Sequence, residues 1–343
     1  MALNIMRAMR TLPAVLMASA IIGSSANAQS ISAEIDFSAG ASSADVQAAA
    51  TQVRVFGDAI AGIQYYVEGA WGRRSGDHLT ISDVFGTAYP YDDRAKLIEA
   101  YGERYFRPGG ALLGIRAGRF RTPFGIYSRS DHAYTGFLRA PLIRYDGYFA
   151  VSNNYLEHGV QVTAGIPQLF IESSVGTPHD MGMAKRRDGI DTVVRVQGFH
   201  GPFIAGASYS NSNPYLPARF ARGRAAFTGV DFRWTYAGVQ VRGEWLTGHP
   251  FVGTNVSTDG WYVDGIVHRP GMGPVTAVLR IESMDYAAQP PRARHADRVV
   301  TGARVRLPGP VTLQLNFTHQ TGDLERAKDN SLDFGATYSF RYR

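Results

Sequence analysis

The main pattern along this chain is a strict alternation of apolar and polar residues in runs of about ten residues. The last segment, SLDFGATYSFRYR, shows it best: Leu332, Phe334 and Tyr338 share one parity, while Asp333 and Thr337 share the other. Because successive side chains of a β-strand point to opposite faces, this alternation predicts strands with one apolar and one polar face. The same pattern occurs in FTGVDFRWTY, AGVQVRGEWL and GPVTLQLNFTHQ.

Two kinds of connection alternate between these predicted strands. Short breaks rich in proline and glycine, which favour tight turns, lie near residues 57–59, 108–110, 167, 201–202, 237–238, 270–273 and 308–310. Longer polar segments lie near residues 41–46, 74–93, 122–154, 177–189, 211–222, 248–258, 287–295 and 322–330. Seven short turns and eight longer loops imply about sixteen strands, with both ends of the chain on one side of the sheet.

This arrangement predicts an all-β fold, a transmembrane antiparallel β-barrel with short periplasmic turns and long extracellular loops. Hydrocarbon cannot satisfy backbone N–H and C=O groups, so a sheet in lipid must close on itself. Runs of about ten residues also have the length that a tilted strand needs to cross a bilayer. The alternative is a soluble β-sandwich or β-helix, but sandwich strands are shorter, about five or six residues, and their exposed faces carry fewer aromatic residues.

The N-terminal segment has the features of a cleaved signal peptide spanning residues 1–28. Arg7 and Arg10 precede an apolar stretch at residues 12–22, and ANA at residues 26–28 forms a small-residue cleavage site. No later apolar run approaches the roughly twenty residues that a transmembrane helix requires. We therefore expect export to the bacterial outer membrane, with residues 29–343 forming a single barrel domain.

The composition narrows the possible partners and the source of stability. The chain has no cysteine, so packing and hydrogen bonds must stabilise it without disulfides. The formal net charge is +6, and nearly all basic residues are arginine, because the only lysines are Lys96, Lys185 and Lys328. The arginines are spread singly along the chain and form no basic patch, which argues against a nucleic-acid partner.

The polar parity of the strands predicts the wall of the lumen. A sixteen-stranded barrel encloses an aqueous channel, so charges on this wall would be solvated or paired between strands. The expected basic wall residues are Arg54, Arg116, Arg195, Arg233, Arg242, Arg280, Arg304, Arg306 and Arg341. The expected acidic ones are Glu34, Asp36, Glu68, Glu172, Asp231, Glu244, Glu282 and Asp333. The alternation is ambiguous in RAKLIEAYGERYF, residues 94–106. Aromatic residues expected at the lipid face or its interfacial girdles include Trp71, Trp234, Trp245, Trp261 and Tyr338.

One segment resembles a known family. RAGRFRTPFGIY, residues 116–127, is similar to an element of the phosphate-selective porin superfamily (porin O/P) of bacterial outer membranes, in which a basic, glycine-containing strand runs into a PFG turn. The resemblance implies sixteen strands, a homotrimer in outer-membrane lipid and lipopolysaccharide, and passive diffusion of small anionic or neutral solutes. Phosphate-selective members line the pore with many lysines and arginines. This chain has three lysines and alternating charges, so phosphate selectivity is not carried over.

The longest connection, Thr122 to Asn154, is the third long loop, and it has the greatest functional interest. Irregular backbone is tolerated at membrane depth where it lines a water-filled cavity, so we expect this loop to fold into the pore and narrow it. An external loop over the pore mouth is the alternative. The residues assigned to the constriction are Arg116, Arg121, Arg129, Asp131, Arg139, Arg144 and Asp146. Their basic balance predicts a modest anion preference.

The sequence gives no positive sign of an enzyme, a metal site or a cofactor. Nine histidines are scattered without the H-E-x-x-H spacing of a zinc site, and the G-x-S-x-G motif of a serine nucleophile is absent. Asp131 and His132 lie near Ser128 and Ser130, but adjacent residues cannot easily form a nucleophile–base–orienter chain. The prediction is an outer-membrane porin; the alternatives are an adhesive or structural barrel or phage receptor, and a lipid hydrolase.

Overall fold

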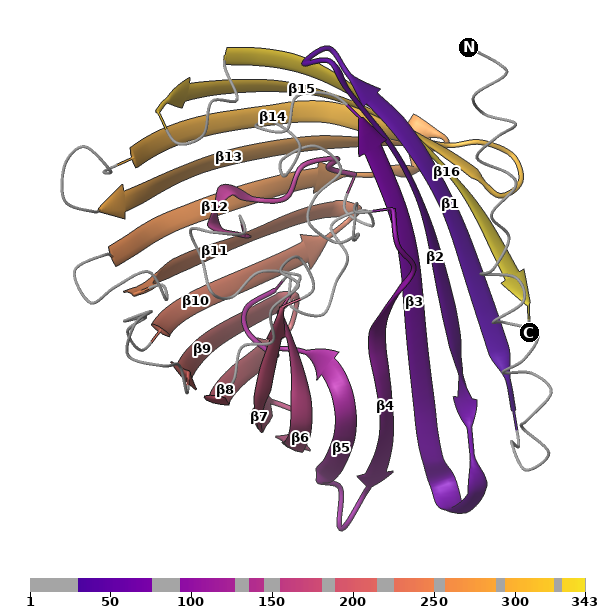
Figure 1. Cartoon of the computed structure of the whole chain (residues 1–343), viewed down its shortest axis with the longest axis vertical. Coiled ribbons are helices and arrows are strands. Elements are labelled where there is room, and N and C mark those ends of the chain that lie inside the picture. Colours follow the sequence, from indigo (N-terminus) through magenta and orange to yellow (C-terminus); the bar gives the residue numbers. More distant parts are fainter. Residues whose placement is uncertain are drawn as a thin grey trace.

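A computed structural model of the chain describes residues 30–75, 93–126, 136–144, 155–180, 189–214, 225–249, 257–287, 294–323 and 329–342. Its sixteen strands form one antiparallel sheet that closes into a barrel (Figure 1). The strands are β1 (Ser32–Ser42), β2 (Val46–Asp58), β3 (Ile63–Ser75), β4 (Lys96–Phe106), β5 (Leu112–Arg121), β6 (Tyr155–Ile166), β7 (Leu169–Asp180), β8 (Gly189–His200), β9 (Phe203–Pro214), β10 (Ala225–Tyr236), β11 (Val239–His249), β12 (Ser257–Val267), β13 (Val275–Ala287), β14 (Arg294–Arg306), β15 (Val311–Gly322) and β16 (Asp329–Tyr342).

Every strand pairs with its neighbours in the sequence, and the first and last strands close the ring. Ala33 on β1 lies opposite Tyr342 on β16, and the pairing continues to Ser42 and Asp333. The seven short connections predicted from proline and glycine all join strands at one end of the barrel, which we call the turn end; the other end is the loop end. The predicted sixteen-stranded antiparallel barrel is therefore confirmed.

The two faces of the sheet have the polarity that the alternation predicts. On β12, Trp261 and Val263 point outward and are 39% and 37% exposed, whereas Tyr262 and Asp264 between and beyond them are buried. The same holds around the ring: exposed large apolar side chains cover the outside, and most buried polar side chains line the inside. This polarity is the reverse of a soluble protein and suits a hydrocarbon environment. Among the described residues, no helix is long and apolar enough to span a membrane.

The ambiguous segment at residues 94–106 contains a β-bulge. Glu68 on β3 pairs with Glu99 on β4, while the next residue, Gly69, pairs with Leu97, so Ile98 is an extra residue on β4. Ile98 and Glu99 are consequently both buried, at 1% and 7% exposure. A bulge inserts one residue into one strand and shifts its parity, which is why the period of two broke down at this point of the sequence.

The first predicted loop differs from the expectation. A longer polar loop was predicted at residues 41–46, but β1 continues to Ser42 and β2 begins at Val46. The turn is tight because Asp45 adopts a positive φ of 59°, a conformation that aspartate tolerates better than most residues. The Ala44 N–H donates to the Ser42 hydroxyl and supports the turn.

The predicted signal peptide, residues 1–28, lies outside the described residues.

Candidate functional site: the inward loop and the barrel wall

The third long connection enters the barrel, as its length and composition predicted. It joins β5 to β6 across residues 122–154, and its described parts are residues 122–126 and 136–144. Both parts are buried: Phe124, Phe137 and Leu142 are each 0% exposed. Residues 122–126 contact inward-facing residues of β8 to β10, and residues 136–144 contact those of β12 to β16. We call residues 122–154 the inward loop.

The loop turns inward from the loop end of β5. Gly118 has a φ of 135°, and a Cβ there would collide with the Ala100 carbonyl oxygen, so only glycine fits. Beyond it, Arg121 reaches the lumen although its parity is opposite to that of inward-facing Arg116. Its guanidinium lies 2.8 Å from Glu68 Oε1 and 2.7 Å from Glu99 Oε2.

A first anchor holds the PFG turn at the start of the loop. The Gly125 N–H donates to Ser208 Oγ on β9 at 3.1 Å, and the Gly125 carbonyl accepts a short hydrogen bond from Arg195 on β8. The same arginine binds both carboxylate oxygens of Asp231 on β10 at 3.0 Å. A Cβ on Gly229 would lie 3.0 Å from the Phe124 ring, so this glycine leaves space for the phenylalanine.

A second anchor holds residues 136–144 against the wall formed by β12 to β16. Here side chains of the wall satisfy loop N–H groups. The Leu138 N–H donates to Asn316 Oδ1 at 2.7 Å, and the same amide donates from Nδ2 to the Gly136 carbonyl at 3.2 Å. The Leu142 N–H donates to Glu282 Oε2 at 2.6 Å. A buried backbone without partners is costly, and these polar groups allow the loop to lie in the lumen.

Two buried arginines of the wall satisfy loop carbonyl groups in the same region. Arg280 donates to the Arg139 carbonyl at 2.9 Å, and Arg298 donates to the Ala140 carbonyl. The Arg298 guanidinium also lies 2.6 Å from Glu282 Oε1. These wall charges therefore bind the loop backbone as well as each other.

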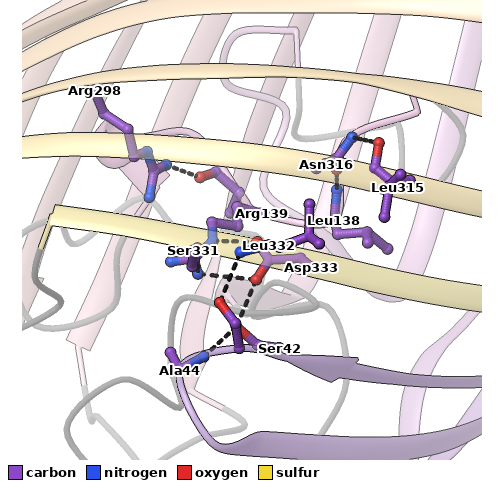
Figure 2. Close-up of polar contacts among 12 residues, drawn as sticks. Ser42, Ala44, Leu138, Arg139, Arg298, Leu315, Asn316, Ser331, Leu332 and Asp333 are labelled. Carbon is purple, nitrogen blue, oxygen red and sulfur yellow. Dashed lines mark hydrogen bonds and ion pairs between the residues drawn. The ribbon is translucent and has the colours of Figure 1, made fainter.

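The side chain of Arg139, in the described part of the loop, makes an ion pair with the wall. Arg139 Nε lies 2.6 Å from Asp333 Oδ2 on β16, and its Nη2 donates to Asp333 Oδ1 at 3.1 Å and to Ser331 Oγ at 2.6 Å. Ser42 on β1 donates to the same carboxylate at 2.6 Å. Figure 2 shows Arg139 lying against Ser331 and Asp333, with Ser42 on the opposite side of the carboxylate. The side chains of Arg139 and Asp333 are 3% and 0% exposed.

An aromatic and charged cluster fills the lumen beside this second anchor. The Arg280 guanidinium lies 4.1 Å from the centre of the Phe137 ring, within cation–π range. Asp264 on β12 binds two arginines, Arg280 Nε at 2.6 Å and Arg242 Nε at 3.0 Å. Phe137 also packs against Val278, so this part of the lumen is a packed core and not open water.

The wall formed by β1 to β5 carries a ladder of ion pairs between neighbouring strands. Arg54 binds Glu34 at 2.8 Å and also binds Asp36. On β5, Arg116 lies 2.7 Å from Glu103 and stacks over the Tyr101 ring at 4.2 Å. The expected pairing between neighbouring strands thus accounts for most charges on this wall.

The residues assigned to the constriction fall into three groups. Arg116, Arg121 and Arg139 face the lumen and are each paired with a carboxylate. The backbone of Arg144 ends a short 3-10 turn, Leu142–Arg144, and its side chain lies outside the described part of the structure. Arg129, Asp131 and Asp146 lie outside the described residues. The constriction assignment stays a prediction.

The arginines assigned to the lumen wall all lie on inward-facing strand positions. Arg54, Arg195, Arg242 and Arg280 are buried and ion-paired. Arg233 and Arg304 are half-buried, and Arg306 is exposed at the turn end of β14. The sequence reasoning did not single out Arg298 and Ser208, and it placed Asn316 on the polar face of its strand without foreseeing that all three hold the loop. Their parity signals the lumen, since Arg298 shares the parity of Arg304, but parity cannot reveal their partners.

The described residues show no group of three or more histidine, aspartate or glutamate side chains placed to hold a metal ion. No protein-family model matches the chain, and a search of curated proteins found no match.

Solved structures share the fold. A porin matches with a TM-score of 0.53 and 11% identity over 91% of this chain and 99% of the porin. OmpT, an outer membrane protein of Vibrio cholerae, matches with a TM-score of 0.56 and 11% identity, over 91% of this chain and 97% of its own. OccK3 (OpdO) of Pseudomonas aeruginosa matches with a TM-score of 0.52 and 12% identity, over 91% and 96%. At such identities the likeness concerns the fold: this chain forms a barrel of the porin type.

Proposed function

We propose that this protein is a porin of the bacterial outer membrane, a passive channel for small hydrophilic solutes with a modest anion preference. The observation that carries the proposal is an irregular loop held inside a closed barrel whose inner wall is polar. A barrel that served only as a membrane anchor would have no need for such a loop. In a channel, the loop narrows the path, and its charges and those of the wall select solutes. Diffusion through such a pore needs no catalytic residue or cofactor.

The anion preference rests on arginines that are not neutralised. Arg116, Arg121 and Arg139 are paired, so they add little net field. The side chains of Arg233 and Arg306 make no hydrogen bond or ion pair within the described part of the chain, and both face the lumen towards the turn end. These two residues, together with Arg129 and Arg144 of the inward loop, are the proposed source of the preference.

The proposed partners follow from the outer surface. The apolar face meets outer-membrane lipid and lipopolysaccharide, with the turn end in the periplasm. On β1 to β5 many outward-facing positions hold small residues, including Ala39, Ala49, Gly69 and Ala100. Small residues allow backbones to approach closely within a membrane, which supports this sector as the contact face of a homotrimer.

Membership of the phosphate-selective porin superfamily is likewise a proposal, supported by the segment RAGRFRTPFGIY at the entry to the inward loop.

Single-channel recording in a planar bilayer under a salt gradient tests the function. A porin gives steady conductance with a reversal potential that reports anion preference. Block of this current by low inorganic phosphate would assign phosphate as a substrate. Folded protein that never conducts would overturn the channel and favour an adhesive or structural barrel, a phage receptor or, less strongly, a lipid hydrolase.

We expect the variants Arg129→Ala and Arg144→Ala to lower the anion preference. Each removes a positive charge from the inward loop, whereas Arg139 is left in place because its ion pair holds the loop against β16. The measurement is the reversal potential in a potassium chloride gradient, which should move towards zero. An unchanged reversal potential in both variants would place these residues away from the narrowest part of the pore.

A further inference from the structure

One arginine of the wall stands apart from the ion-pair pattern. Arg233 lies on β10 near the turn end and faces the lumen. It is half-buried, and its side chain makes no hydrogen bond or ion pair with any described residue. Two other inward-facing arginines nearby, Arg195 on β8 and Arg242 on β11, each bind a carboxylate.

The carboxylates nearest to Arg233 bind other arginines. Asp231, two positions before Arg233 on the same face, lies over Gly206 of β9, where a Cβ would come within 2.6 Å of its Oδ2. From there both its oxygens accept hydrogen bonds from Arg195 at 3.0 Å. Asp264 is shared between Arg242 and Arg280. Neither carboxylate is within ion-pair distance of Arg233.

The direct cross-strand neighbours of Arg233 offer no acceptor either. They are Ile204 on β9, which is apolar, and Arg242 on β11, which carries the same charge. Like charges directly opposite each other in a sheet are destabilising. In addition, the Nε atoms of Arg233 and Arg195 are buried without a hydrogen-bond partner. A buried polar atom without a partner in the protein is expected to bind a water molecule or an ion.

We propose that Arg233 is the binding site of a small carboxylate solute in the periplasmic half of the lumen. A guanidinium presents two parallel N–H groups that match the two oxygens of a carboxylate, as Arg280 does with Asp264 through Nε and Nη2. A bound carboxylate would supply the missing acceptor and offset the repulsion between Arg233 and Arg242. This inference rests on the proposed channel function, since a solute must reach the site through the pore.

Block of chloride current by gluconate tests the site. Gluconate carries one carboxylate and is bulkier than chloride, so it should reduce the chloride conductance while it occupies the site. In Arg233→Ala the half-blocking concentration should rise about tenfold, the effect of losing one hydrogen-bonded charged partner. Arg233→Lys keeps the charge without the paired N–H groups. Its half-blocking concentration should lie between those of the unaltered protein and Arg233→Ala. Arg107→Ala is the matched control, because Arg107 is an exposed residue of the turn between β4 and β5 and carries the same charge.

The outcomes separate the site from the channel. Equal weakening in Arg233→Ala and Arg107→Ala would mean that net charge alone matters, and would overturn the site. Conductance without gluconate block in the unaltered protein would overturn the site and leave the channel proposal intact. Inorganic phosphate, tested in parallel, should block less well than gluconate; stronger block by phosphate would overturn the carboxylate assignment. If the folded protein does not conduct, calorimetric titration in detergent decides: gluconate binding that Arg233→Ala abolishes supports the site, and no binding overturns it.

Discussion

Asp333→Ala is expected to destabilise the barrel by about 3–5 kcal/mol and to release part of the inward loop. The variant leaves the Arg139 guanidinium in a site where it is 3% exposed, without the carboxylate that neutralises it. An unpaired charge in such surroundings is far less stable than the pair, and the loop segment around Arg139 can relieve it only by leaving the wall. The expected readouts are a lower denaturant midpoint and a larger or noisier single-channel conductance.

Two comparisons make this prediction specific. In the double variant Arg139→Ala/Asp333→Ala no charge is stranded, so part of the lost stability should return. In Arg73→Ala the broken pair is Arg73 with Asp93, whose side chains are 67% and 55% exposed at a separation of 3.9 Å. An exposed pair contributes about 0–1 kcal/mol, so this control should be nearly neutral. Wild-type conductance in Asp333→Ala would contradict the view that this ion pair holds the loop.

Ile281→Arg is expected to destabilise the membrane-inserted barrel by about 2–4 kcal/mol. Ile281 lies at the middle of β13, faces outward and is 45% exposed, which in a membrane means exposure to hydrocarbon. An arginine there must lose its hydration or extend towards the interface. The measurement is the fraction folded into lipid vesicles across a denaturant series, read from the mobility of unheated samples on a gel.

Val275→Arg provides the matched control on the same strand and face. Val275 is the first residue of β13, at the turn end, where the side chain reaches the interface. The penalty for arginine falls to about 0–1 kcal/mol near the interfaces. Equal stability losses in the two variants would mean that the apolar outer face does not lie across a bilayer.

The inward loop shows how far its amino-acid sequence predicts its role. Its position, its length and its inward course followed from the chain itself, because no strand pattern occupies residues 122–154 and a wide barrel has room for it. The role of Arg139 did not follow. This residue was expected to supply positive potential, and the structure instead places it in an ion pair with Asp333, which is 194 positions away in the sequence.

For the arginines of the wall, too, the sequence predicted the position but not the partners. Parity correctly placed Arg195 and Arg280 in the lumen, where a solvated, selective wall was one expectation. In the structure both donate to backbone carbonyls of the inward loop. Arg233 has the same parity and the same chemistry, yet it has no partner among the described residues. Sequence alone could not distinguish a paired arginine from an unpaired one, because the pairing depends on which carboxylates lie close by once the barrel has closed.

The sequence by itself determined the number of strands, the place of the seven proline- and glycine-rich turns and the face that most strands present. These are local properties: side-chain direction alternates from one residue to the next, and hydrocarbon admits no unpaired backbone. Only the tertiary structure decided the bulge at Ile98, the two anchors of the inward loop and the pairing of the charges. Those depend on contacts such as Asn316 with Gly136, 180 positions apart, which arise only once the barrel has closed and the loop has entered it.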